Sequence, residues 1–259
     1  MIKALFFDID GTLVSFNTHR IPASAISALK QAKDKGLKIF IATGRPKKLI
    51  NNLTEIEELI DGYVTTNGAY CFASGTDILF TPISEPDVKT VMRSVDEYGV
   101  ACIIVGKYDV RIHNITPQFK EMARMLAVDG IKMDTPLDEL LRQGVVQMTP
   151  FFNREQELQA VAGTRNCISS RWFPDFTDIT ANGADKGKGI EAVARHFGIR
   201  IEETMAFGDG GNDTTMLAAA GIGVAMGNAA DEVKSHADYV TTPVDNDGIA
   251  SALRHFKII

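Results

Sequence analysis

Two carboxylates stand two positions apart near the start of the chain, in Asp8-Ile9-Asp10-Gly11. They follow the apolar run Ala4 to Phe7, which predicts a buried parallel strand. Because alternate residues of an extended chain share a side, Asp8 and Asp10 are expected close together. Such a pair repels itself in an apolar setting unless a cation lies between, and Mg²⁺ is the natural candidate. Taken alone, the pair could also be an Asp-Gly turn held by an Asx hydrogen bond.

Two later stretches offer groups that could bind an anion. Ala42-Thr43-Gly44-Arg45-Pro46 supplies a hydroxyl and backbone donors at the predicted start of a helix. Asp185-Lys186-Gly187-Lys188-Gly189 places two lysines at another helix start, where one lysine could balance phosphate and the carboxylates. Each stretch alone is also compatible with an ordinary helix cap or a solvated loop.

A third stretch, Gly208 to Met216, combines acids and an amide after a strand. Asp209 suits a metal ligand, Asp213 a second ligand or an orienting group, and Asn212 a donor to phosphate. Their spacing does not fit an EF-hand loop, which alternates its ligands and ends in Glu.

Alternating strands and helices must position these residues. The pattern predicts strands over 4–7, 37–42 and 62–66, helices over 22–36 and 46–60, and a hairpin over 70–82. It resumes with helix 186–197, strand 204–209, helix 212–220, strand 222–225, helix 230–236, strand 238–241 and helix 247–256. This rhythm indicates an α/β fold with a doubly wound parallel sheet, whose binding crevice lies at the carboxyl ends of its strands.

The pattern changes between these two parts. Strands are predicted over 100–105, 109–114, 144–149 and near 166–180, and helices over 86–98, 117–129, 136–142 and 153–162. The short turn Gly106-Lys107-Tyr108 favours an antiparallel sheet with helices on one face. We therefore predict a core domain over 1–81 and 181–259 with an α+β domain inserted over 82–180.

Composition narrows the classes of partner. The 259 residues are 45% hydrophobic and 23% charged, with a net charge of −6 that offers no basic surface for nucleic acid or an anionic membrane. No apolar run suits a signal peptide or a membrane span. The three scattered cysteines show no metal spacing. A cytoplasmic enzyme is expected, as a monomer, with an oligomer left open.

These motifs, in this order, resemble those of the haloacid dehalogenase superfamily, in which Asp-x-Asp-Gly-Thr follows the first strand. The place of the insertion resembles the Cof-type branch, sugar-phosphate phosphatases with a large α/β cap. Thr66-Asn67-Gly68-Ala69 and the tail Gly223 to Ala229 also resemble that branch. One departure is Lys186-Gly187-Lys188-Gly189-Ile190, where the branch reads Lys-Gly-x-Ala-Leu. Register favours Lys186 as the motif lysine and leaves Lys188 as the alternative.

The resemblance implies Mg²⁺-dependent hydrolysis of a small phosphorylated metabolite, a phosphate monoester such as a hexose or pentose phosphate. Asp8 would be the nucleophile and Asp10 the general acid and base. Asp8, Asp209 and the backbone carbonyl of Asp10 would hold the metal, with Asp213 supporting it. The phosphate would be bound by Thr43, Gly44, Lys186 and Asn212. A phosphosugar mutase and a catalytically silent phosphate sensor are the alternatives.

Overall fold

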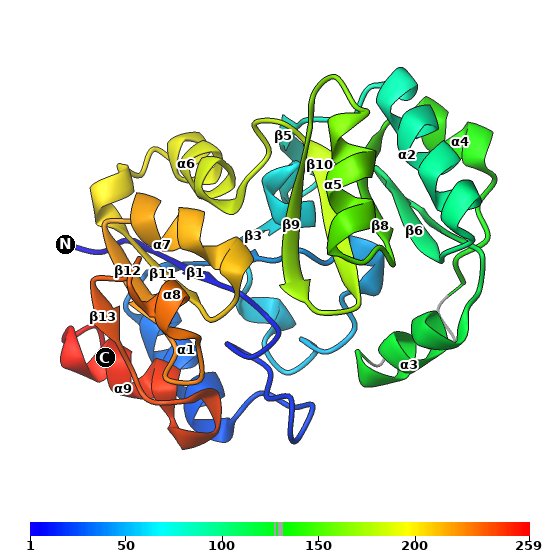
Figure 1. Cartoon of the computed structure of the whole chain (residues 1–259). Coiled ribbons are helices and arrows are strands. Elements are labelled where there is room, and N and C mark those ends of the chain that lie inside the picture. The colour runs from blue at the N-terminus through cyan, green and yellow to red at the C-terminus, as the bar shows by residue number, and fades with distance from the viewer. Residues whose placement is uncertain (127, 129–131) are drawn as a thin grey trace. The chain divides into compact units, whose positions relative to one another are not determined.

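The computed structural model describes residues 1–126, 128 and 132–259, and the chain forms two compact units (Figure 1). The core unit comprises Met1–Gly44, Asn52–Leu79 and Asp185–Ile259. The inserted unit comprises Arg45–Asn51 and Phe80–Ala184. The inserted unit therefore also takes in residues 45–51, 80–81 and 181–184, which the predicted core domain over 1–81 and 181–259 included. Within the described ranges, we find no helix with the length and apolar character needed to cross a membrane.

An eight-stranded sheet forms the centre of the core unit, in the order β13-β12-β11-β1-β2-β3-β4-β5. The first six strands in this order are parallel, and β4 runs antiparallel to β3. The strands are β1 (Ala4–Phe7), β2 (Lys38–Ala42), β3 (Gly62–Thr65), β4 (Tyr70–Ala73), β5 (Thr76–Phe80), β11 (Thr204–Gly208), β12 (Ile222–Ala225) and β13 (Tyr239–Val240). This confirms the α/β fold class, with the sheet extended by the predicted hairpin.

The central strands are buried because both faces of the sheet are covered. On one face Phe6 stacks on Phe40, with ring centroids 4.8 Å apart, and α6 and α7 pack over them. Phe7 stacks on Phe207 with centroids 4.7 Å apart. In Figure 1, α1 and α9 lie beside each other on the side of the sheet away from α6 and α7. The helices of this unit are α1 (Ala23–Asp34), α6 (Lys186–His196), α7 (Thr214–Ala219), α8 (Asp231–Lys234) and α9 (Gly248–His255).

The predicted helix over 46–60 is wrong. The segment forms only two short 3₁₀ turns, η1 (Lys47–Leu49) and η2 (Glu57–Leu59). The carbonyl of Leu49, which a helix would offer to the N–H of Leu53, accepts instead from Arg45 Nη1 at 3.0 Å. The adjacent Asn51 and Asn52 also have low helix propensity. The apolar spacing of this segment therefore reflects burial of turns, not of a helix.

A five-stranded antiparallel sheet forms the inserted unit, in the order β7-β6-β8-β10-β9. Helices α2, α4 and α5 pack an apolar core against one face of it, as predicted for the helices of this unit. Of the described residues in that core none belongs to helix α3, whose Phe119 contacts Phe151 instead, with ring centroids 6.3 Å apart. The predicted helix over 117–129 is observed as α3 up to Met125, and residues 127 and 129 lie outside the described part of the chain. The elements are β6 (Cys102–Gly106), β7 (Val110–His113), β8 (Val145–Pro150), β9 (Cys167–Phe173), β10 (Phe176–Ala181), α2 (Glu85–Tyr98), α3 (Pro117–Met125), α4 (Leu137–Gln143) and α5 (Arg154–Ala162).

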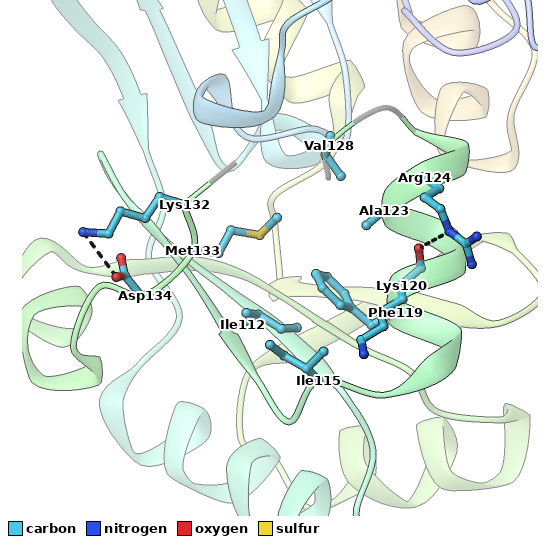
Figure 2. A pocket seen from close by; sticks show the side chains of 10 residues that line it. All are labelled: Ile112, Ile115, Phe119, Lys120, Ala123, Arg124, Val128, Lys132, Met133 and Asp134. Carbon is cyan, nitrogen blue, oxygen red and sulfur yellow. Dashed lines mark hydrogen bonds and ion pairs between the residues drawn. The ribbon is translucent and has the colours of Figure 1, made fainter. Parts of the chain in front are cut away.

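A cavity of about 550 Å³ lies beside α3 in this unit (Figure 2). Its walls include Ile112, Phe119 and Met133, and the Lys132–Asp134 ion pair, with an N–O distance of 3.3 Å, lies on its rim. None of the predicted site residues lines it.

Candidate active site

The two central strands of the core sheet bring the first and last motifs together. β1 and β11 are parallel neighbours, with Phe7 opposite Phe207, and the N–H of Asp8 donates to the Phe207 carbonyl at 3.0 Å. Asp8 directly follows β1, and Asp209 directly follows β11. The strand order reverses between β1 and β11, which is where open α/β sheets bind their ligands.

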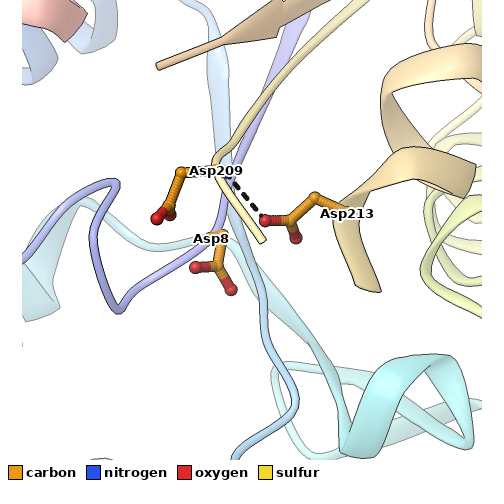
Figure 3. A group of neighbouring side chains, drawn as sticks. All are labelled: Asp8, Asp209 and Asp213. Carbon is orange, nitrogen blue, oxygen red and sulfur yellow. Dashed lines mark hydrogen bonds between the residues drawn. The ribbon is translucent and has the colours of Figure 1, made fainter. Parts of the chain in front are cut away.

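Three carboxylates meet at this edge of the sheet. Asp8, Asp209 and Asp213 each contribute an oxygen, and these oxygens all lie within 4.8 Å of one another (Figure 3). Asp8 and Asp213 are buried, and Asp209 is half-buried. The carboxylate of Asp10 is not part of this group, although its charge contributes to raising the pKa of Asp8 and of Asp209.

Lys186 is fully buried among these carboxylates. Its ammonium donates to Asp8 Oδ1 at 2.7 Å and to Asp213 Oδ1 at 2.5 Å. The Lys188 side chain is 57% exposed, and its ammonium lies 3.4 Å from Asp185 Oδ2, away from the three carboxylates. The geometry therefore favours Lys186 over Lys188 as the lysine of the site.

Asp213 orients the turn that carries Asp209. Its Oδ2 accepts from the backbone N–H groups of Asp209 at 2.9 Å and of Gly210 at 2.8 Å. A Cβ on Gly208 would lie 2.5 Å from the Asp213 side chain, so a glycine is required there. Both Asp213 oxygens thus have donors, and an orienting role suits this residue better than direct metal ligation.

Two residues without a predicted role hold the Asp209 carboxylate. The Thr12 hydroxyl donates to Asp209 Oδ1 at 2.7 Å, and Asn228 Nδ2 donates to Oδ2 at 3.2 Å. Asn228 also donates to the Gly11 carbonyl and accepts from the Val244 N–H. Both lie in stretches that resembled the family, Thr12 in the first motif and Asn228 in the tail, but their partners could be known only from the fold.

The charges of the site fit a divalent cation. Burial and then the charge of Asp213 raise the pKa of Asp8 well above its ordinary value, with Asp209 and Asp10 adding to the shift. Burial and then Asp213 likewise raise the pKa of Asp209 to about 7. A single lysine among three carboxylates leaves excess negative charge, and a hard cation with oxygen ligands would relieve it.

The second motif lies next to the residues after β3. Thr43 is buried, its N–H donates to the Val64 carbonyl at 2.8 Å, and its carbonyl accepts from the Asn67 N–H at 3.1 Å. Asn212 Nδ2 donates to Asn67 Oδ1 at 2.9 Å. Only a 3₁₀ turn follows Pro46, so the predicted α-helix N-terminus is absent and cannot supply backbone donors to an anion. Phosphate binding by Thr43 and Gly44 stays a prediction.

Three consecutive residues after β3 have a left-handed backbone. The φ angles are 50° at Thr66, 52° at Asn67 and 88° at Gly68. Glycine adopts this region readily and asparagine fairly often, whereas a β-branched threonine rarely does. Non-glycine residues held in such conformations cost about 1–3 kcal/mol each and tend to occur at functional sites.

Three polar side chains of the inserted unit, those of Arg111, His113 and Arg171, make contacts within that unit. Arg171 donates to Glu157 Oε2 at 2.8 Å and to two backbone carbonyls. Arg111 donates to the Thr135 carbonyl at 3.4 Å, and His113 Nε2 lies 2.7 Å from Asp96 Oδ1. These contacts give the three side chains structural roles.

The sequence of this chain is similar to those of known hydrolases and phosphatases. The family model of the haloacid dehalogenase-like hydrolases matches residues 5–253. YkrA of Bacillus subtilis (strain 168) is 33% identical, over 99% of this chain and 98% of its own length. The 5-amino-6-(5-phospho-D-ribitylamino)uracil phosphatase YcsE of the same organism is 28% identical, over 99% of this chain and 96% of its own length.

A solved structure gives a further comparison. The HAD subclass IIB sugar phosphatase BT4131 is 51% identical and superimposes with a TM-score of 0.94, covering 99% of this chain and 100% of its own. The matched region contains the four motifs of the site and both units. The chain therefore belongs to the haloacid dehalogenase-like hydrolases.

Proposed function

We propose that this protein hydrolyses phosphate monoesters, namely small sugar phosphates such as hexose or pentose phosphates, with Mg²⁺ as its cofactor. The observation that carries the proposal is the buried Asp8 carboxylate at the end of β1. It accepts from the Lys186 ammonium at 2.7 Å and is grouped with the carboxylates of Asp209 and Asp213. The similarity to the sugar phosphatase BT4131 supports the substrate class.

The metal would be held by Asp8, Asp209 and the backbone carbonyl of Asp10, the last of which rests on the family resemblance. Asp213 would support the site through its hydrogen bonds to the Asp209 turn. When bound, Mg²⁺ reduces the repulsion between carboxylate and phosphate and stabilises negative charge on the phosphoryl oxygens.

The reaction would proceed in two steps through an aspartyl-phosphate. In the first, an Asp8 oxygen bonds to phosphorus while the bond from phosphorus to the leaving oxygen breaks, and Asp10 gives that oxygen a proton. In the second, Asp10 takes a proton from water while the water oxygen bonds to phosphorus. The bond from phosphorus to the Asp8 oxygen breaks, which frees the Asp8 carboxylate and inorganic phosphate. Lys186, Thr43, Gly44 and Asn212 would bind the transferring group.

The two domains would divide binding of the substrate between them. All the predicted catalytic, metal-binding and phosphate-binding residues belong to the core unit. We therefore assign the chemistry to the core unit, which makes up most of the catalytic domain predicted over 1–81 and 181–259. Recognition of the leaving group is assigned to the inserted unit, which contains the cap domain predicted over 82–180.

A screen of phosphorylated metabolites tests this function. We expect release of inorganic phosphate with Mg²⁺ and none with EDTA, and Asp8→Asn should lose at least about a thousandfold in kcat/KM because it removes the nucleophile. Asp34→Asn, the same change at an exposed position of α1, is the control and should keep full activity.

Other outcomes would contradict the proposal in distinguishable ways. An isomerised sugar phosphate without phosphate release would indicate a mutase. Bound ligand with no turnover would indicate a sensor. Activity of Asp8→Asn within about tenfold of the original would exclude Asp8 as the nucleophile.

A further inference from the structure

We propose that Asn67 is a positioning residue, which sets the Asn212 carboxamide for binding the substrate phosphate and joins the phosphate-binding segments to one another. The inference rests on the proposed function. Thr66–Gly68, the turn η3 after β3, belongs to a stretch to which the proposed reaction gives no role. It lies entirely in the core unit, as do all its partners below.

Asn67 contacts two phosphate-binding segments directly. Its side-chain Oδ1 accepts from Asn212 Nδ2 at 2.9 Å, and its backbone N–H donates to the Thr43 carbonyl at 3.1 Å. A carboxamide nitrogen carries two hydrogens. When one hydrogen of Asn212 is bonded to Asn67, the amide plane is fixed and the second hydrogen has a defined direction in which to meet a phosphate oxygen.

The next residue of the turn packs on the third segment. A Cβ on Gly68 would lie 2.1 Å from the carbonyl oxygen of Asp185, the residue that caps α6 immediately before Lys186. The turn therefore contacts the backbone of Thr43, the side chain of Asn212 and the start of the helix that carries Lys186.

The conformation of the turn opposes local preference, which favours a functional role. Asn67 is 5% exposed and has a φ of 52°, and Thr66 before it has a φ of 50°. Thr66 Oγ1 is buried, and within the described residues it has no hydrogen-bond partner. The fold thus maintains an unfavourable backbone and an unsatisfied hydroxyl in order to present Asn67 between Thr43 and Asn212.

A double-mutant cycle tests the inference. Asn67→Gly keeps the left-handed backbone, which glycine adopts readily, and removes the Oδ1 acceptor. It should lower kcat/KM for a phosphate monoester, and weaken inhibition by inorganic phosphate, by about five- to tenfold. In an Asn212→Ala background the same change should cost less than about twofold, because the group that Asn67 positions is already gone.

Asn114 supplies a matched control. It is exposed, has a φ of 57° and belongs to the inserted unit, so Asn114→Gly makes the same chemical change in the same backbone region. This variant should keep full activity. Asn67→Ser is a second variant for the cycle, since Ser74 shows that a serine adopts this region in the chain, with a φ of 48°.

The outcomes separate this inference from the function on which it rests. An active wild-type protein in which Asn67→Gly costs the same factor with and without Asn212 would overturn the positioning role alone, as would an unchanged affinity for inorganic phosphate. A wild-type protein that neither releases nor binds phosphate would overturn both.

Discussion

Lys186 shows how a single side chain can determine the charge balance of a site. Burial alone would lower its pKa, but the charges of Asp213 and Asp8 and their hydrogen bonds raise it well above the ordinary value for lysine. The neighbouring carboxylates therefore favour the charged form of the Lys186 ammonium, while their own pKa values are raised. Removing it would leave those carboxylates buried without a compensating charge.

Replacing Lys186 and Lys188 in turn distinguishes their roles. Lys186→Ala should lower kcat/KM by at least about tenfold, since a charge-assisted hydrogen bond to phosphate contributes about 1.5–3 kcal/mol, and should lower the Tm of the metal-free protein. Lys188→Ala should change both by little, because that side chain is 57% exposed. Steady-state kinetics and thermal melts of the pair provide the measurement. A larger loss in Lys188→Ala would transfer the phosphate contact to Lys188.

Asp209 should make the stability of the metal-free protein depend on pH. Its pKa is raised to about 7 in the folded protein, from about 4 in an unfolded chain. A raised carboxyl pKa stabilises the folded state at low pH, and this contribution is lost as the pH rises through the folded value. In EDTA, the Tm should therefore fall between about pH 4 and pH 7 more steeply than in Asp209→Asn.

Mg²⁺ provides the second arm of that experiment. A cation at the site favours the ionised carboxylate, so adding Mg²⁺ should flatten the fall in Tm of the original protein and have less effect on Asp209→Asn. If the Tm changes with pH by the same amount in both proteins, with and without Mg²⁺, then Asp209 does not titrate in this range.

At the scale of elements, the glycine at position 189, where the stretch Lys186 to Ile190 departs from the family pattern, has a packing reason. The family branch has alanine where this chain has Gly189, in the first turns of α6. A Cβ there would lie 2.4 Å from Val64 Cγ1 of β3 and 3.2 Å from the Cα of Gly68. Glycine thus allows α6 to approach β3 and the Asn67 turn closely.

Gly189→Ala should therefore destabilise the protein although alanine favours helices. Intrinsic propensity favours alanine by about 1 kcal/mol, while overpacking costs about 1–3 kcal/mol, so the Tm should fall. Val64→Ala removes both γ-methyl groups, including the Cγ1 that a Cβ at position 189 would meet. Gly189→Ala should therefore lower the Tm less in the Val64→Ala protein than in the original protein. Thermal melts of the four proteins measure this coupling. A Tm that rises in Gly189→Ala alone would contradict the close approach.

Periodicity in the sequence predicts the helices and strands whose apolar residues are buried in the expected pattern. The apolar run of β1 and the amphipathic pattern of α2 both appear where expected. Over 46–60 the structure has two 3₁₀ turns in place of the predicted helix, and the Leu49 carbonyl accepts from Arg45, a residue outside the repeating pattern. A side chain that competes for backbone hydrogen bonds leaves no periodic signal.

For the whole molecule, the order of motifs along the chain predicted the α/β fold class, because strands that alternate with helices have few allowed arrangements. The sequence motifs also predict all three acidic residues that lie together, from Asp8 at one end of the chain to Asp213 near the other. Thr12 and Asn228 could not be assigned, since their bonds to Asp209 join segments up to 197 positions apart, and only the strand order brings these together.

That strand order also has a consequence for synthesis on the ribosome. β1 pairs along one edge with β11, and Thr204, the partner of Ala4, is translated roughly 200 residues later. At about 5–20 residues per second, this edge of β1 waits roughly 10–40 s for its neighbour. All five strands of the other sheet precede β11 in the chain, so that sheet can be completed first. The nascent protein can therefore hold an assembled sheet of the inserted unit while Asp8, the proposed nucleophile, still lacks Lys186 and Asp209. The proposed site is complete only after most of the chain has emerged from the ribosome.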